Sequence, residues 1–375
     1  MKKKVFLVFG TRPEAIKMYP VYKELNKFDD IETKVIITSQ HQEMLKQVLE
    51  MFEIKVDYDL NVMEDRQTLT KITVKVLNGM KEIFEKEKPN LTLVHGDTTT
   101  TFASALASFY EKIPIGHVEA GLRTYNKYSP FPEEMNRELT DALADLFFAP
   151  TEQTKLNLIK EGVKEFKIFV TGNTIVDSLL EIISKDAKTD LPIEENKKFI
   201  VVTAHRRENW GQPMENICKA IDYISKKYGN EYKIIFSVHK NPVVRNVVNN
   251  ILQNNENVKL VEPMDYITFI KLLSKAEIIL TDSGGIQEEA PTLKKPVLLL
   301  RETTERPEGI ESGVVKLIGT NFEKIVIEVE NLINNENERN SVANVRNPFG
   351  DGLAGRRIAK IVHEYLLSGG TDGIS

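Results

Sequence analysis

Short apolar runs alternate with amphipathic stretches along almost the whole chain, and this alternation limits the folds that the chain can adopt. Continuous runs of Val, Ile, Leu and Phe are typical of strands that are covered on both faces. Strands that alternate with helices imply parallel sheets joined by right-handed crossovers, so we predict an α/β fold. The predicted strands cover residues 5–9, 35–38, 91–94, 115–118, 146–149, 168–170, 199–203, 233–238, 258–261, 278–281, 297–300 and 314–317. Helical patterns lie between them, for example at residues 44–51, 67–86, 99–111 and 322–333.

An acidic, lysine-rich stretch at residues 186–198 separates the strands into two groups. A chain of 375 residues is too long for one compact core, so two domains are expected. We predict one domain over residues 1–185 and another over residues 199–347. Pro348 and two nearby glycines then form a turn, and an amphipathic helix follows it. We expect residues 348–375 to cross back to the first domain as this helix and to end in a polar tail.

The composition excludes several classes of protein. The net charge of −5 argues against a nucleic-acid coat, and no stretch approaches the roughly 20 apolar residues of a membrane span. The lysines at positions 2–4 precede an apolar run that is too short for a secretory signal, so we expect a cytoplasmic protein. The one cysteine, Cys218, allows no intramolecular disulfide and is expected to be a buried, inert thiol.

Several sequence motifs are missing, and their absence narrows the chemistry. No group of Cys and His residues has the spacing of a zinc site. The chain also lacks the G-x-S-x-G pattern of a hydrolase nucleophile and the G-x-G-x-x-G pattern of a tightly bound dinucleotide. We therefore expect neither a metal site nor a tightly bound NAD.

Two glycine-rich turns, at residues 94–100 and 281–289, each follow a predicted strand and precede a predicted helix. Open α/β sheets bind ligands at the carboxyl ends of their strands, and a helix N-terminus there favours an anion. One such turn lies in each half of the chain. We therefore expect a single ligand held between two domains, and a sugar nucleotide fits that expectation.

Charged residues follow three strands of the first domain. Arg12 lies in the turn after the first strand, where it either stays solvated or contacts a phosphate. Asp97 either only caps the next helix or faces a ligand together with the threonines that follow it. Glu119 is charged at the point where the chain leaves the core.

A predicted helix after two prolines begins with Glu133 and Glu134. Acidic residues in a first helical turn are often only partners of the helix dipole. Glu133 and Arg137 lie four residues apart on one helix face. They form either a surface pair or a pair that faces a ligand.

In the second domain, His205, Arg206 and Arg207 follow the first strand and are candidates for phosphate binding, because an arginine fork fits phosphate oxygens. A solvated charge cluster is the alternative. His239 ends the next strand and is either structural or functional. The turn Ser283-Gly284-Gly285 exposes backbone N–H groups to a diphosphate, and Glu289, one turn further on, can bind ribose hydroxyls.

Taken together, these stretches closely resemble the non-hydrolysing UDP-N-acetylglucosamine 2-epimerases. The resemblance extends from the first strand into the last third of the chain, in the order that the family has. The matching segments are GTRPEAIK (residues 10–17), HGDTTTT (95–101), HVEAGLRT (117–124), YSPFPEEMNR (128–137), TAHRRENWG (203–211) and DSGGIQEEAP (282–291). The resemblance implies the GT-B architecture, in which two Rossmann-like domains with parallel sheets face a central cleft, and a homodimer.

The resemblance also implies an activity and a set of site residues. The family interconverts UDP-GlcNAc and UDP-ManNAc without a redox cofactor, and the product serves cell-surface polysaccharides. The UDP and sugar sites map onto Arg12, Lys17, Arg137, His205, Ser283, Gly284, Gly285 and Glu289. The catalytic groups map onto Asp97, Glu119, Glu133 and His205. An allosteric UDP-GlcNAc subsite maps onto Gln40, His41, Arg66, Gln67, Arg207 and His239, although the family often has Gln where this chain has Glu43.

The chemistry explains why such a site needs carboxylates. The hydrogen on C2 of the sugar is not next to a carbonyl, so its direct removal is implausible. If the C1–O bond breaks first, the cationic ring makes that hydrogen acidic and a carboxylate can take it. Fixed donors then stabilise the departing UDP, and carboxylates with separated pKa values serve as acid and base.

Three other functions share many of these features. A GT-B glycosyltransferase would transfer the sugar of a UDP-sugar to an acceptor. A hydrolysing epimerase would release free ManNAc and UDP. A non-catalytic UDP-sugar sensor would bind without exchanging the C2 hydrogen.

Overall fold

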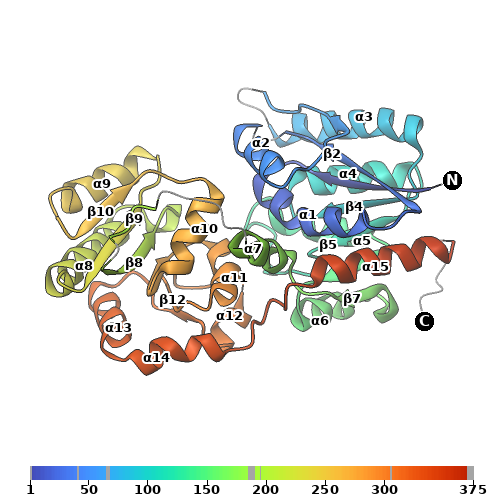
Figure 1. Cartoon of the computed structure of the whole chain (residues 1–375). Helices are drawn as coiled ribbons and strands as arrows, with labels where there is room; N and C mark the ends of the chain where they lie inside the picture. Colours follow the sequence, from blue (N-terminus) through green and yellow to red (C-terminus); the bar gives the residue numbers. More distant parts are fainter. Residues whose placement is uncertain are drawn as a thin grey trace. The chain divides into compact units, whose positions relative to one another are not determined.

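The computed structural model describes residues 2–39, 42–64, 68–184, 191–194, 196–304 and 306–369. The chain divides into two compact units (Figure 1). Unit 1 contains Met1–Ser178 and Phe349–Ser375, and unit 2 contains Leu179–Pro348. The chain therefore leaves unit 1 once and returns to it for its last helix.

Unit 1 is built on a parallel sheet with the strand order β3-β2-β1-β4-β5-β6-β7. Its strands are β1 (Lys3–Phe9), β2 (Ile31–Ile37), β3 (Tyr58–Asp59), β4 (Leu91–His95), β5 (Ile115–Val118), β6 (Leu146–Ala149) and β7 (Ile168–Val170). Its helices are α1 (Arg12–Leu25), α2 (Gln42–Met51), α3 (Leu69–Glu87), α4 (Thr99–Tyr110), α5 (Glu133–Leu143), α6 (Glu152–Lys160), η1 (Glu165–Lys167) and α15 (Ala354–Leu367). Helix α7 (Thr174–Ser184) begins in unit 1 and carries the chain out of it.

Unit 2 has a second parallel sheet with the order β10-β9-β8-β11-β12-β13. Its strands are β8 (Lys198–Thr203), β9 (Tyr232–Ser237), β10 (Val258–Val261), β11 (Ile278–Thr281), β12 (Val297–Leu299) and β13 (Val315–Leu317). Its helices are η2 (Arg207–Asn209), α8 (Gln212–Tyr228), α9 (Pro242–Leu252), α10 (Tyr266–Lys275), α11 (Gly284–Leu293), α12 (Pro307–Glu311), α13 (Phe322–Asn334), α14 (Glu336–Ser341) and η3 (Val342–Asn344).

The sequence explains how the first turn of unit 1 forms. Strand β1 is apolar and its last five residues are buried, so the chain turns only at Gly10. Thr11 caps α1 by accepting from the Glu14 backbone N–H, and the Glu14 carboxylate accepts from the Thr11 backbone N–H at 2.7 Å. This reciprocal pair satisfies two donors at the helix start, which fixes where α1 begins.

The two faces of the first sheet are covered by different helices. Phe6 and Val8 of β1 share an apolar cluster with Val76 and Met80 of α3, and α4 contributes to the same cluster. Helix α15, drawn in red in Figure 1, runs beside α1, drawn in blue. The last helix of the chain therefore packs on the first helix.

The twelve predicted strands are confirmed to within a few residues, and β3 is a further strand that the sequence does not predict. It contains only Tyr58–Asp59 and pairs with Ile36 and Ile37 of β2. No apolar run marks so short an edge strand in the sequence. Cys218 is confirmed as a buried thiol, and burial raises its pKa to about 12. Among the described ranges, no helix combines the length and the apolar character that crossing a bilayer requires.

Candidate active site

The carboxyl ends of two adjacent strands in unit 1 bring charged side chains together. Strands β4 and β5 pair in parallel, so the turn that contains Asp97 and the turn that contains Glu119 emerge at the same edge. Gly96 donates its backbone N–H to the Val118 carbonyl at 2.9 Å, which joins the two turns directly. This edge is where open α/β sheets bind ligands.

Glu119 is held in a backbone conformation that side chains seldom adopt. Its φ is +68°, in the left-handed region, and such strain costs of order 1–3 kcal/mol in a non-glycine residue. The side chain is almost buried, and its Oε2 accepts from Lys17 Nζ of α1. His95 Nε2 lies 3.8 Å from the same oxygen. Two predicted site residues, Lys17 and Glu119, are therefore in direct contact.

Asp97 is bound to α5 at two points. Arg137 Nε donates to Asp97 Oδ2 at 2.9 Å, and Asn136 Nδ2 donates to the Asp97 carbonyl at 2.9 Å. The Asp97 side chain remains about 28% exposed, whereas Arg137 is buried. The carboxylate is thus fixed in orientation but still accessible to a ligand.

The acidic first turn of α5 contains one structural carboxylate and one accessible carboxylate. Glu134 is fully buried, and its Oε1 accepts the backbone N–H groups of Thr124 and Tyr125, each at 2.7 Å. Arg137 Nη1 donates to Glu134 Oε2 at 2.8 Å, so the surface-pair alternative for Arg137 is wrong. Glu133 begins the helix and is partly exposed.

A buried network joins the turns that contain Asp97 and Glu119 to α5. His117 Nδ1 is 2.6 Å from Asp141 Oδ1, and its Nε2 donates to the Gly96 carbonyl at 2.8 Å. Arg123 Nη2 donates to Asp141 Oδ2 at 2.7 Å. Burial raises the pKa of Asp141, but contact with His117 and Arg123 more than offsets it, and the pKa falls below its usual range.

The threonines after Asp97 bond within unit 1, which favours capping over ligand binding for their hydroxyls. Thr98 Oγ1 donates to Glu14 Oε1 at 2.7 Å and caps α4 by accepting from the Thr101 N–H. Thr101 Oγ1 lies 2.6 Å from the His95 carbonyl, to which it donates. Burial raises the pKa of Glu14, and hydrogen bonds from Thr98, Gly10 and Thr11, in the turns before α4 and α1, oppose the rise. Arg12, at the start of α1, is partly exposed.

In unit 2, Asp282 organises the predicted phosphate-binding turns. It is fully buried at the end of β11, and its Oδ2 accepts from the His205 N–H and the Arg206 N–H, each at 2.8 Å, and from Asn209 Nδ2 at 2.9 Å. His205 Nδ1 lies 3.3 Å from Asp282 Oδ1. Burial lowers the pKa of His205; Asp282 opposes that effect, while His239 and Arg206 reinforce it.

Helix α11 begins with small residues, as the sequence predicts. Ser283 is its N-cap residue and makes no side-chain cap, so the first N–H groups of the helix keep their donor capacity. Gly285 is exposed, and Glu289 is buried one turn further along. Tyr266 donates from its hydroxyl to Glu289 Oε1 at 2.9 Å, which orients that carboxylate. The turn is suited to an anion with a hydroxylated group beside it.

Only part of the predicted second subsite can be placed. Gln40, His41, Arg66 and Gln67 lie outside the described residues. Arg207 is exposed, with its guanidinium carbon 5.9 Å from the centre of the Trp210 ring. The His239 ring meets the His205 ring edge to face, with their centres 5.5 Å apart. The contact joins a predicted substrate residue to a predicted allosteric one.

Sequence reasoning missed three residues that orient the site: Asn173, Asp141 and Asp282. Each is a buried polar side chain that reaches a turn distant in sequence, and no local pattern marks Asn173 or Asp141. The signal for Asp282 was available, because it is the carboxylate between β11 and the glycine turn. Asn173, just before α7, donates from Nδ2 to Glu119 Oε2 at 3.1 Å.

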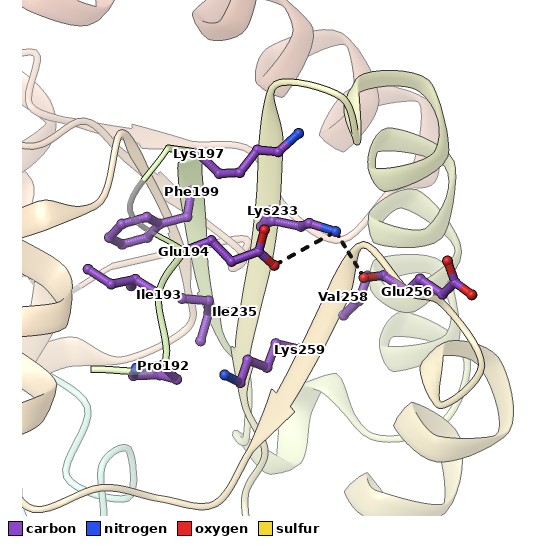
Figure 2. A pocket seen from close by; sticks show the side chains of 10 residues that line it. All are labelled: Pro192, Ile193, Glu194, Lys197, Phe199, Lys233, Ile235, Glu256, Val258 and Lys259. Atoms are coloured by element: carbon purple, nitrogen blue, oxygen red, sulfur yellow. Dashed lines mark hydrogen bonds and ion pairs between the residues drawn. The ribbon is translucent and has the colours of Figure 1, made fainter. Parts of the chain in front are cut away.

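A small cavity of about 180 Å³ in unit 2 contains none of the predicted site residues (Figure 2). It is lined by Phe199, Lys233 and Val258 at the amino ends of β8, β9 and β10, and by Pro192 and Ile193. Lys233 Nζ donates to the Glu256 carbonyl at 3.1 Å. The cavity thus lies at the end of the sheet opposite to His205 and Ser283, and we assign no role to it.

Known proteins resemble this chain over nearly its whole length. A family model described as UDP-N-acetylglucosamine 2-epimerase matches residues 23–363. The UDP-N-acetylglucosamine 2-epimerase of Salmonella typhimurium is 51% identical over 375 residues, covering 97% of this chain and 100% of that protein. The structure of the Neisseria meningitidis UDP-GlcNAc 2-epimerase bound to UDP-GlcNAc has a TM-score of 0.89 at 49% identity, covering 96% of this chain and 100% of that one.

A more distant structure bears on the fold alone. The glycosyltransferase of kitacinnamycin is 10% identical, with a TM-score of 0.67 and coverage of 98% of this chain and 100% of that one. The predicted α/β fold of two Rossmann-like domains with parallel sheets is therefore confirmed by topology and by these neighbours.

Proposed function

This chain belongs to the UDP-N-acetylglucosamine 2-epimerase family, and we propose that it interconverts UDP-GlcNAc and UDP-ManNAc without hydrolysis. The C1–O bond breaks and its electron pair leaves with UDP, while a carboxylate removes the C2 proton and a glycal remains. A proton then returns to C2 from the opposite face, and UDP adds back to C1. Atoms and electrons balance, and no cofactor is required.

The observation that carries this proposal is the pair of carboxylates at the ends of β4 and β5. Asp97 and Glu119 come from adjacent turns, and each is oriented by a cation, Arg137 or Lys17. We assign them as the acid/base pair, with the accessible Glu133 as the stabilising charge or alternate base. Two carboxylates in different surroundings can have separated pKa values, which lets one donate while the other accepts.

We assign nucleotide binding mainly to groups of unit 2. His205 and the Ser283-Gly284-Gly285 turn would stabilise the departing diphosphate, with Arg12 of unit 1 as a further cation. Glu289, oriented by Tyr266, would accept hydrogen bonds from the ribose hydroxyls. The Neisseria meningitidis relative binds UDP-GlcNAc, which supports this ligand class.

We extend the proposal to regulation and assembly by family analogy. A second UDP-GlcNAc would bind at Gln40, His41, Arg66, Gln67, Arg207 and His239, and the protein would act as a cytoplasmic homodimer that supplies ManNAc for surface polysaccharides. Initial rates that rise sigmoidally with UDP-GlcNAc would support the subsite, and hyperbolic kinetics would count against it. Light scattering at the mass of one chain would exclude the dimer.

The deciding experiment is incubation with UDP-GlcNAc in D₂O followed by NMR of the nucleotide sugar. Elimination and re-addition place deuterium at C2 and yield UDP-ManNAc. Unlabelled C2 at equilibrium would exclude this route. Free ManNAc with UDP would instead identify a hydrolysing epimerase, and transfer of the sugar to an acceptor would identify a glycosyltransferase.

A further inference from the structure

Asn173 is fixed at both ends of its side chain, immediately before α7. It is buried, and its Oδ1 accepts the Ile175 backbone N–H at 3.1 Å. Its Nδ2 donates to Glu119 Oε2 at 3.1 Å. Because the oxygen faces a backbone donor, the opposite amide orientation would place two donors together, so the nitrogen must face Glu119.

The backbone of Asn173 is also held firmly. Its N–H donates to the Phe349 carbonyl at 2.7 Å, where the chain re-enters unit 1. An added Cβ on Gly172 would lie 3.4 Å from the Gly350 Cα, and both glycines have positive φ. The outgoing and returning segments of unit 1 therefore meet closely, and Asn173 lies where they meet.

Lys17 and Asn173 both donate to Glu119 Oε2, but they differ in stiffness. The Lys17 ammonium is on a flexible four-carbon stem, whereas the Asn173 amide is on a short side chain at a helix start. The other carboxylate oxygen of Glu119 faces the neighbouring turn, because an added Cβ on Gly96 would lie 3.8 Å from Oε1. Gly96 is the residue before Asp97.

We propose that Asn173 is a positioning residue for the epimerisation: it fixes the rotation of the Glu119 carboxylate so that Oε1 is presented beside the Asp97 turn. This inference rests on the proposed function, in which Glu119 is one of the acid/base groups. Glu119 also has a strained backbone, and such a conformation persists only where surrounding contacts, here including that of Asn173, hold it.

Two substitutions of Asn173 remove the amide donor to Glu119 but keep an oxygen that can cap α7. Asn173→Ser keeps an oxygen that can cap α7 but is too short to reach Glu119. Asn173→Asp keeps Oδ1 as the cap and replaces the donor with an acceptor. For both variants we expect kcat for C2 deuterium exchange to fall about 100-fold at about pH 8, with KM within about threefold, because misplacement by about 1 Å has that effect. Asn321→Ser, at the N-cap of α13 in unit 2, is the matched control and keeps the wild-type rate.

The pH dependence of kcat for Asn173→Asp distinguishes positioning of Glu119 from capping of α7, because a change in the cap alone would not produce it. Two adjacent carboxylates raise one pKa of the pair, so at lower pH they share a proton and a donor to Glu119 is restored. Among the residues that the structure describes, Lys17 from α1 and His95 from β4 also face Glu119, and both are present in every variant. We expect the ratio of Asn173→Asp to wild-type kcat to rise at least about tenfold from about pH 8 to about pH 5.5, while the Asn173→Ser ratio stays flat.

Different results would contradict the positioning role of Asn173 and the proposed function. Rates within about threefold of wild type for both variants, or a flat ratio for Asn173→Asp, would overturn the positioning role. A wild-type enzyme without C2 exchange would refute the proposed function instead. A crystal structure of Asn173→Ser would then test the role of Asn173 by itself. A displaced Glu119 carboxylate would support the positioning role, and an unmoved carboxylate would reject it.

Discussion

Both Nε and Nη2 of Arg137 lie 2.9 Å from Oδ2 of Asp97. The contact crosses from α5 to the end of β4 and is formed by a buried guanidinium. A charge-assisted pair of this kind holds Oδ2 of the carboxylate in place, and an amide oxygen could accept the same bonds, so the shape of the site should survive when only the charge of Asp97 is removed.

Asp97→Asn tests whether the Asp97 carboxylate is needed for proton transfer or only for the shape of the site. The amide keeps the side-chain volume but cannot exchange a proton with C2. We expect the rate of C2 deuterium exchange to fall by about 10³-fold while UDP binding changes less than about threefold, as measured by NMR and calorimetry. Asp29→Asn, on an exposed surface of unit 1, is the control. Lost UDP binding with retained chemistry would favour a transferase-type role for Asp97.

The Glu14 carboxylate bonds groups at the start of α1 and at the start of α4. The loss of stability when Glu14 is replaced should depend on how many of these hydrogen bonds the new side chain can form. Glu14→Leu leaves the Gly10 and Thr11 N–H donors without their carboxylate, and we expect a loss of about 2–4 kcal/mol in the free energy of unfolding. Glu14→Gln should lose less than about 1 kcal/mol, because its Oε1 can accept those N–H groups while the hydroxyl of Thr98 turns to accept from Nε2.

Urea denaturation followed by circular dichroism measures both Glu14 variants. Because burial raises the pKa of Glu14, the neutral amide also avoids the cost of a buried charge. Equal losses for the two variants would show that charge, and not the set of acceptor sites, is what the turn requires.

The strands and the turns of this fold are predictable because their signals are local. The apolar run of β1 and the Thr11 cap of α1 are read directly from adjacent residues. The contact of Asn173 with Glu119 joins residues 54 positions apart, and it depends on the pairing of β5, β6 and β7 side by side. No single-sequence pattern encodes that adjacency, so the candidate carboxylates and their cations Lys17 and Arg137 were predicted, whereas Asn173 was not.

The pKa of His205 should shift in opposite directions when Asp282 and when His239 is replaced. Burial lowers the pKa of His205, Asp282 opposes the shift and His239 adds to it. Asp282→Asn should therefore lower the pKa of His205 further, whereas His239→Phe should raise it toward the ordinary value. Histidine NMR titration measures both, and shifts of the same sign in the two variants would contradict the assignment.

We expect Asp177 to make the stability of unit 1 depend on pH. Its carboxylate accepts the N–H groups of Gly355 at 2.8 Å and Ala354 at 3.2 Å, at the start of α15. Burial raises the pKa of Asp177 from 3.8 to about 6. The folded protein therefore binds a proton that the unfolded chain releases, so the free energy of unfolding contributed by this group rises as pH falls through about 6.

Asp177→Asn removes this titration and keeps one acceptor for α15. When the pH falls from about 7.5 to about 5.5, the free energy of unfolding of wild type should increase by on the order of 1 kcal/mol relative to that of the variant. Urea midpoints at the two pH values measure the difference. A gain of the same size in both proteins would assign the pH dependence to other groups.

Gly355→Ala tests how closely α15 packs on α1. Alanine usually favours a helix over glycine by about 1 kcal/mol, so an open position would be stabilised. Here an added Cβ would lie 2.6 Å from Cβ and 2.7 Å from the carbonyl carbon of Pro20, which is inside α1. The contact is with a proline ring and backbone, which cannot rotate away, so α15 must shift and we expect a net loss of about 1–3 kcal/mol. Lys360→Ala on the exposed face of α15 is the control and should change stability by less than about 0.5 kcal/mol. A Gly355→Ala protein as stable as wild type by thermal denaturation would mean that the two helices do not approach this closely in solution.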